Sequence, residues 1–328
     1  MIERKKIVFE VKTPFFIGEG EEYESIDYVF DEKFKVIDKS RFNKKVFENE
    51  ALYEKFMNIA DKAKELRVFF KENVTEFLYE VDISDRAKEV LSQGGNVKKF
   101  IRDKFTNEVI IPGSTIKGAI RTALANHLFH KKYYDELINE NDEQRFLNKI
   151  FRDGSKNAQD DLLKTLFVSD LKPKYYKLKI LRPKYYIKQF DESKEMDVLE
   201  FLVEGVFEGE IYINKNLLNK LLEYKNNLEK LSFNLIEESL KDFYEDILNF
   251  ESSRITNPMF KFPNYEEFLI KIGLHSGAGA KTIKDKRDIF VRLSNGQKFP
   301  HQSYQFSTWF DEDNNAIGWG RLEFKEEG

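Results

Sequence analysis

The residues best placed to do chemistry lie around a turn at Pro112 and Gly113. Ser114 follows the turn, and Lys117 and Arg121 stand four residues apart in a segment whose apolar residues recur at helical spacing. Like charges at this spacing repel each other, and cations are disfavoured at the positive end of a helix dipole. A bound anion would remove both penalties. The pattern therefore predicts a phosphate-binding helix start.

Gly118 lies between the two basic residues and leaves room for a ligand to approach the backbone. We expect Ser114 to be the N-cap of this helix, and the free amides of its first turn to face the same ligand. No acid stands nearby in the sequence to balance Lys117 or Arg121. The alternative is an ordinary core helix with two solvated basic residues, because helix starts of this kind are common.

The run IPGSTIKGAIRTAL, residues 111–124, resembles the signature of the RAMP superfamily of CRISPR-associated proteins. It is most similar to the signature of the type III-A (Csm) effector subunit that caps the 3′ end of CRISPR RNA. Residues 12–20 resemble the "TP-hydrophobic-HIGSG" segment of that family, with Phe16 in place of the usual His. Residues 166–170 resemble its "hFhSD" strand, and residues 318–320 resemble its closing "LGW" element.

The resemblance implies a non-catalytic structural subunit that binds CRISPR RNA at the 3′ end of the guide and supports guide maturation and antiviral defence. It also implies a ferredoxin-like (RRM-like) core and no cofactor. The expected partners are the guide RNA and other Csm subunits, namely the repeated backbone subunit and the small helical subunit. Host ribonucleases are a further candidate partner.

A second candidate RNA-binding surface is the glycine-rich segment 273–287. Gly277 and Gly279 free backbone amides to face phosphates, and neighbouring basic residues supply charge. Ala280 stands where a P-loop needs glycine, and Thr282 replaces the third glycine of a Rossmann turn, so ATP or NAD binding is not expected. The alternative is a flexible surface loop. The basic residues of this segment are Lys281, Lys284, Lys286 and Arg287.

A third basic stretch, residues 172–188, interleaves tyrosine with lysine and arginine and contains no acid. Such a surface can neutralise phosphates and stack bases, so Lys174 and Lys184 are candidate RNA-binding residues. The alternative is an exposed edge hairpin that its lysines protect from aggregation. Acidic residues are concentrated immediately afterwards, up to residue 210.

His275 is a weak candidate for a catalytic residue. A metal-independent endoribonuclease that processes CRISPR RNA needs a general base and a general acid near the 2′-hydroxyl, and His275 stands in the glycine-rich segment. No partner acid or base is identifiable, so we prefer the RNA-binding interpretation. His127 and His130 have a metal-ligand spacing, but no carboxylate completes a set, and we predict no metal site. Asp170 is interpreted as a turn cap.

The composition is that of a globular protein, with 41% hydrophobic and 34% charged residues in 328. The absence of cysteine excludes disulfides and thiolate metal sites. No apolar run reaches the length of a membrane span, and the N-terminus leads directly into a strand, so a cytoplasmic location is expected. The net charge of −4 argues against a generic nucleic-acid binder, so RNA contacts must be local.

Strands separated by helices without a regular βαβ rhythm predict the α+β class. We expect a strand at residues 5–12, a helical insertion at about 40–95 and a long helix at 217–250. We also expect a strand at 162–170, a strand pair at 201–213 broken at its glycines, and a short helix at 265–272. The predicted domains are an N-terminal RAMP or ferredoxin-like domain, residues 1–200, and a C-terminal α+β domain with long helices and the glycine-rich loop, residues 201–328.

Overall fold

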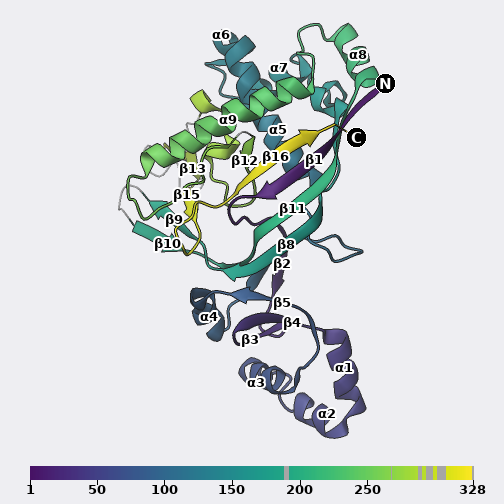
Figure 1. Cartoon of the computed structure of the whole chain (residues 1–328), viewed down its shortest axis with the longest axis vertical. Helices are drawn as coiled ribbons and strands as arrows, with labels where there is room; N and C mark the ends of the chain where they lie inside the picture. Colours follow the sequence, from purple (N-terminus) through teal and green to yellow (C-terminus); the bar gives the residue numbers. More distant parts are fainter. Residues whose placement is uncertain (188–191, 267, 287–289, 293–297, 301–307, 327–328) are drawn as a thin grey trace.

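The computed structural model describes residues 1–187, 192–266, 268–286, 290–292, 298–300 and 308–326. Within these residues the dominant feature is an 11-stranded mixed sheet (Figure 1). Its main path runs in the order β12 (Leu269–Lys271), β16 (Trp319–Lys325), β1 (Ile2–Val11), β11 (Val198–Asn214), β8 (Lys172–Leu181), β5 (Phe77–Ile83), β4 (Lys33–Ile37) and β3 (Tyr28–Phe30).

Three short strands join this sheet beside the main path: β2 (Gly18–Tyr23), β6 (Val97–Phe100) and β7 (Leu166–Val168). Strands β6 and β7 both pair with β11, and β2 pairs with β6. The described residues also contain two smaller sheets, which consist of β9 (Lys184–Ile187), β10 (Glu192–Glu195) and β15 (Thr308–Phe310), and of β13 (Phe290–Arg292) and β14 (Lys298–Pro300).

Two long helices, α5 (Gly113–Leu128) and α9 (Phe233–Arg254), pack against each other and contribute to the main core together with β1, β11 and β16. The apolar stripe predicted for α5 is confirmed, because Ile116, Ile120 and Leu124 are fully buried. The shorter helices around them are α6 (Tyr134–Leu137), α7 (Glu143–Arg152) and α8 (Lys215–Tyr224), with the helical turns η1 (Phe129–Tyr133), η2 (Ala158–Asp160), η3 (Leu162–Thr165), η4 (Gly279–Lys281) and η5 (Lys284–Lys286).

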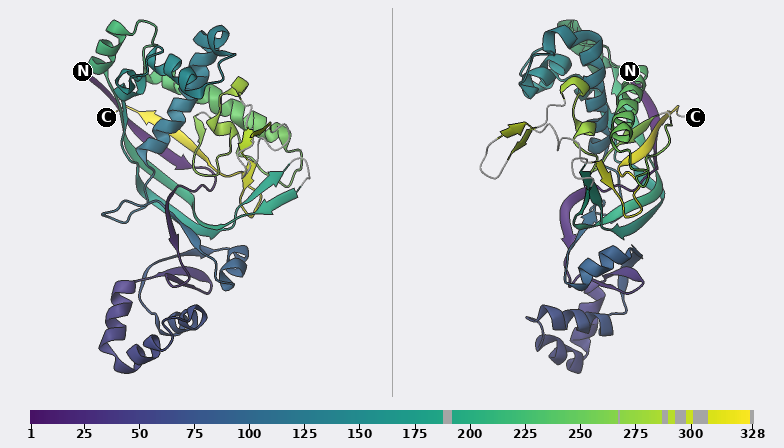
Figure 2. Two further views of the ribbon diagram at one scale, coloured as in Figure 1. Left: turned by 180° about the vertical axis from the view of Figure 1, so that it is seen from behind. Right: turned by 90° about the vertical axis from the view of Figure 1, so that its left-hand side faces the viewer.

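The predicted helical insertion is present in a smaller body built around the β5–β4–β3 end of the main sheet (Figures 1 and 2). One hydrophobic cluster, which includes Phe69, lies within it, and another, which includes Phe34, is shared with Ile180 of β8 and Val198 of β11. The body contains the strands β3, β4 and β5 as well as helices, so it is more mixed than the helical pattern predicted. Its helices are α1 (Lys39–Glu48), α2 (Glu50–Met57), α3 (Ala63–Asn73) and α4 (Asp85–Ser92).

A buried ion pair joins this smaller body to the main sheet. Arg102 donates two hydrogen bonds to the Glu200 carboxylate, at 2.7 and 2.9 Å. The hydroxyl of Tyr79, on β5, donates to the same carboxylate at 2.7 Å. Burial and the charge of Glu200 raise the pKa of Tyr79, so this hydroxyl stays protonated. The satisfied network holds β5 against β11 and β6.

Several element boundaries differ from the sequence prediction. Residues 198–214 form one continuous strand, because the backbone of β8 approaches Gly205 so closely that a Cβ there would lie 2.8 Å from the Tyr175 carbonyl oxygen. The predicted helix at 265–272 is wrong, since β12 pairs with β16 there. The predicted strand at 162–170 begins only at Leu166, after η3. The long helix at 217–250 is two helices, α8 and α9.

The α+β class is confirmed by the large mixed sheet and its helices. The division at residue 200 stays a prediction, and β11 runs through that position. In the part of the chain that the structure describes, we find no helix with the length and apolarity that a membrane span needs.

Candidate functional site

The segments singled out in the sequence meet in pairs in the structure. The first pair joins the start of α5 to the end of β7, where the Gly113 amide donates a 2.8 Å hydrogen bond to the Asp170 carboxylate. Asp170 therefore caps the helix, as its predicted capping role suggests. The prediction that Ser114 is the N-cap is wrong, because the helix begins at Gly113 and Pro112 holds the cap position.

Gly113 has a packing role. A Cβ at this position would lie 2.3 Å from the Val168 carbonyl oxygen and 2.6 Å from that of Ser169. No side chain fits at such distances, so the glycine is required for α5 to approach β7. This close approach fixes which faces of α5 point toward solvent.

The second pair joins the N-terminal segment to the C-terminal segments. The Trp319 amide donates to Thr13 Oγ1 at 3.0 Å, and the Leu274 amide donates to the Phe16 carbonyl oxygen at 2.9 Å. Gly273 has a φ of +95°, and a Cβ there would lie 2.6 Å from the same Phe16 oxygen. The glycine-rich segment is thus held against the loop that precedes β2.

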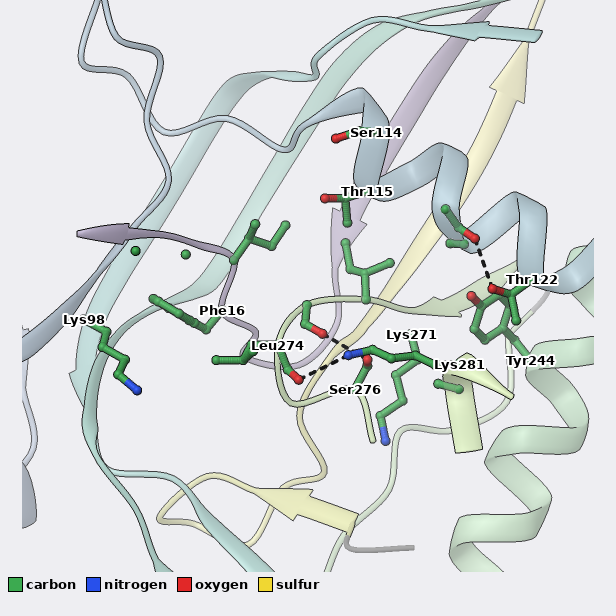
Figure 3. Close-up of a pocket in the computed structure, with 18 of the residues that line it drawn as sticks. Phe16, Lys98, Ser114, Thr115, Thr122, Tyr244, Lys271, Leu274, Ser276 and Lys281 are labelled. Carbon is green, nitrogen blue, oxygen red and sulfur yellow. Dashed lines mark hydrogen bonds between the residues drawn. The ribbon is translucent and has the colours of Figure 1, made fainter. Parts of the chain in front are cut away.

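The start of α5 and the glycine-rich segment face each other across a pocket with a volume of about 620 Å³ (Figure 3). Three predicted RNA-binding residues line it: Ser114 and Gly118 from α5, and Lys281 from η4. All three are exposed to solvent. The sequence therefore identified two of the segments that form this pocket, although they are far apart in the chain.

Lys281 is the cation best placed to meet an anion at the pocket. Its Nζ donates to the Leu274 carbonyl oxygen at 3.5 Å, and no described carboxylate lies within ion-pair distance. Lys98 also lines the pocket, but it pairs with Asp197 at 2.8 Å. Lys281 thus has no ion pair among the described residues, although Glu21, which pairs with Lys99, and Glu22 also line the pocket.

Lys117 and Arg121 lie on another side of α5, away from this pocket. The Lys117 ammonium donates to the Leu166 carbonyl oxygen at 2.7 Å and lies 5.9 Å from the centre of the Phe167 ring. Partial burial lowers the pKa of Lys117. Arg121 lies 3.3 Å from Asp161, so the expectation that no acid balances it is wrong. Forty residues separate the two in sequence, and a local pattern cannot reveal the pair.

The rest of the glycine-rich segment turns toward the helices. Lys284 Nζ pairs with Asp246 of α9 at 2.7 Å, and the Lys284 amide donates to Asn126 at 3.0 Å. Gly277 has a φ of +81°, and Gly279 is buried at the start of η4. The side chain of Lys286 and the whole of Arg287 lie outside the described residues.

Neither predicted residue of the basic stretch 172–188, Lys174 or Lys184, is a free surface cation. Lys184 is only 6% exposed, and its burial, which lowers its pKa, contradicts the expected surface role. Lys174 is exposed but lies 2.9 Å from Glu208, which also pairs with Lys6. Part of the acidic stretch that follows in sequence lies on β11, which pairs with β8 and supplies Glu208 to Lys174, and part lies on β10, which supplies Glu195 to Arg182. Strand β5 pairs with β8 only at Lys179 and Ile180, so the exposed first part of β8 is paired on one side only, by β11, as the edge alternative expects.

Of the three described histidines, His127 and His275 are partly buried and His130 is exposed. The His275 ring packs on Trp309, with ring centres 4.1 Å apart, and its Nδ1 has no hydrogen-bond partner among the described residues. Burial lowers the pKa of His275 to about 4, so the ring is neutral at pH 7 and is not a general acid there. His127 is half-buried and faces Asp242 at 3.2 Å. His130 lies 3.7 Å from Asp285.

The sequence did not reveal the other residues that line the pocket. Phe16 stands in the segment 12–20, which resembles a family motif, and Thr122 lies one helical turn after Gly118. Lys98 also lines the pocket. Tyr244 and Lys271 come from α9 and β12, and no local signal places them at the same site. Lys271 is bound by both oxygens of Glu251 at 2.6 Å, so this buried pair has no net charge.

Comparison with known families matches this architecture. A model of the RAMP superfamily matches residues 8–282. The chain belongs to the RAMP superfamily. The prediction from the run at residues 111–124 is thereby confirmed.

Two curated relatives show which proteins of the superfamily this chain is similar to. The protein named "CRISPR system Cms protein Csm5" from Methanocaldococcus jannaschii is 26% identical over 336 residues, covering 95% of this chain and 76% of that protein. The Csm5 protein from Streptococcus thermophilus is 29% identical over 302 residues, covering 84% of this chain and 79% of that protein. The expected similarity to a Csm subunit is confirmed by these relatives.

Two solved structures share the fold. A chain in the cryo-EM structure of a Csm–crRNA–target RNA ternary complex of a type III-A system superposes with a TM-score of 0.71 at 17% identity, covering 97% of this chain and 100% of that one. The crystal structure of Csm5 from T. onnurineus gives a TM-score of 0.65 at 15% identity, with coverages of 96% and 99%. At these identities the likeness establishes the fold alone.

Proposed function

We propose that this chain is a structural, CRISPR RNA-binding subunit of a type III-A (Csm) effector complex. In this role it lies at the 3′ end of the guide and supports guide maturation and antiviral defence in the cytoplasm. The similarity to proteins named Csm5, and to a chain of a complex that contains crRNA, supports this role. The expected partners are the guide RNA, the backbone subunit and the small helical subunit, with host ribonucleases as a further proposal.

The observation that carries the proposal is the pocket shared by α5 and the glycine-rich segment. The exposed Ser114 hydroxyl, the open surface at Gly118 and the Lys281 ammonium, which has no ion pair among the described residues, lie around one opening. Hydroxyl and ammonium groups suit phosphate and 2′-hydroxyl recognition, which carries no sequence information. A guide whose sequence varies requires this kind of contact.

In this proposal Lys117 and Arg121 do not contact the RNA at the pocket. They act on it through the electrostatic field of their positive charges. Together with Arg152, they place three cations around the single carboxylate of Asp161. The excess positive charge attracts a polyanion along α5 without direct contact at the pocket. This role replaces the direct grip that the sequence pattern suggested.

The finer fold assignment also stays a proposal. We interpret the sheet around β1, β11 and β16 with the packed helices α5 and α9 as a ferredoxin-like RAMP core. The division into residues 1–200 and 201–328, with a second, glycine-rich α+β part, stays a prediction, because this core takes α9, β16 and most of β11 from the second range.

The test is the affinity of the purified chain for a labelled single-stranded RNA of about 10 nucleotides, measured at several salt concentrations. Lys281→Glu should weaken binding about tenfold or more and lower the salt slope by about one, because one phosphate contact is lost. Lys71→Glu, at an exposed position of α3, makes the same charge change far from the pocket and should have a smaller effect. Equal affinity and salt slope in wild type and Lys281→Glu would refute the proposed site.

A further inference from the structure

The pocket has an outer rim and an inner wall of different character. The rim consists of exposed residues, among them Ser114, Gly118 and Lys281. The inner wall consists of buried lining residues, namely Phe16, Ala119, Tyr244, Ile272, Ser276 and Ala280, together with the neutralised pair of Lys271 and Glu251. A phosphate needs charge, but this wall presents apolar groups and hydroxyls without net charge.

Tyr244 carries an unused hydrogen-bonding group into this wall. Its side chain is 1% exposed, and its hydroxyl makes no hydrogen bond with any described residue. Figure 3 shows Tyr244 reaching from α9 toward α5 beside Thr122, whose hydroxyl donates to the Gly118 carbonyl oxygen at 3.2 Å. A hydroxyl that lines the pocket and has no described protein partner is available to bond to a polar ligand there.

Gly118 adds an independent observation. A Cβ at this position would have no neighbouring atom within 4 Å, so the packing of the protein does not require a glycine there. Glycine in the interior of a helix is destabilising relative to alanine. The residue therefore keeps space open at the mouth of the pocket at a cost to helix stability.

We propose that the pocket takes one unpaired nucleobase of the bound RNA, and that the Tyr244 hydroxyl bonds to the edge of that base. The phosphate and sugar stay outside at the rim, where Ser114 and Lys281 lie. A volume of about 620 Å³ is in the range of pockets that enclose small organic ligands. Unpaired RNA bases are commonly splayed out and read in this way. This inference rests on the proposed RNA-binding function.

The test compares two probes of equal length: a short single-stranded RNA and an abasic ribose-phosphate strand. Wild type should bind the RNA about tenfold more tightly than the abasic strand, because only the RNA fills the pocket. Tyr244→Phe should lose about fivefold in RNA affinity and nothing on the abasic strand. Its melting temperature should be unchanged or higher, because the removed hydroxyl has no partner in the protein. Tyr224→Phe, on the exposed face of α8, is the matched control and should leave both affinities unchanged.

A second variant tests whether the open space beside Gly118 is needed for binding of the base. Gly118→Leu places a side chain where a Cβ meets no protein atom, so the helix should fold, while the preference for RNA over the abasic strand should disappear. Equal affinity of wild type for both probes would overturn the base pocket. The same holds if Tyr244→Phe and Gly118→Leu both keep the wild-type preference for RNA over the abasic strand. Either result would leave the proposed RNA-binding function intact. Failure of wild type to bind either probe would overturn both.

Discussion

Arg121 and Asp161 lie 3.3 Å apart, and the same carboxylate accepts a hydrogen bond from Arg152 at 3.1 Å. The carboxylate also accepts the Leu163 amide at 3.0 Å. Because one acid serves two arginines and the start of η3, it ties α5 and α7 to the strand that follows. The positive charge of Arg121, which the sequence pattern predicted to bind an anionic ligand, is therefore partly neutralised by a carboxylate of the protein itself.

Asp161→Asn should destabilise the protein by about 3 kcal/mol, because it leaves two partly buried arginines without their carboxylate. Urea denaturation followed by circular dichroism measures this change. Asp135→Asn, at an exposed position of α6, removes the same charge and should change stability little. Equal free energies of unfolding for the two variants would contradict the shared role of Asp161.

The two glycines of α5 should respond in opposite directions to alanine. Gly113→Ala should cost about 2 kcal/mol or more, because its Cβ would collide with the backbone at Val168. Gly118→Ala should stabilise the protein by about 1 kcal/mol, because it meets no neighbour and improves helix propensity. Thermal melts of the two variants test the pair, and changes of the same sign would refute this interpretation.

The buried pair of Lys271 and Glu251 should behave as a unit. Lys271→Met should cost about 3–5 kcal/mol, because it leaves the Glu251 carboxylate buried without its cation. The double variant Lys271→Met with Glu251→Leu should be more stable than Lys271→Met alone, since both charges are then removed. A double-mutant cycle in guanidinium measures the coupling, and simple additivity would argue against it.

Stability should fall in acid because of His275. Its folded pKa is lowered to about 4 from an ordinary value near 6.5, so between these values the unfolded chain binds a proton that the folded chain does not. Stability from the neutral ring is therefore present above about pH 6.5 and is lost as the pH falls toward 4, with an upper limit of about 3 kcal/mol.

The measurement is the free energy of unfolding at pH 7 and at pH 4.5, in wild type and in His275→Asn. The variant should lose less stability than wild type between the two pH values, because asparagine does not titrate. Other titrating groups are common to both proteins and cancel in the difference. An identical pH dependence would show that His275 is not the group responsible.

Local sequence patterns predicted the elements whose character is set by their own residues. The apolar spacing in α5 and the alternation in β1 are examples, because periodicity and turn residues act within a few positions. The pattern was misleading where a distant strand intervened, as at Gly205, where the approach of β8 made one long strand of a predicted pair.

The sequence by itself determined the family, the α+β class and two of the segments that meet at the pocket, because these depend on local order and on short runs of residues. Only the tertiary structure decided that Arg121 faces Asp161, that Lys184 is buried, and that Tyr244 reaches the pocket. The physical reason is that burial and charge pairing are set by neighbours in space. Those neighbours come from segments that are far apart in the chain.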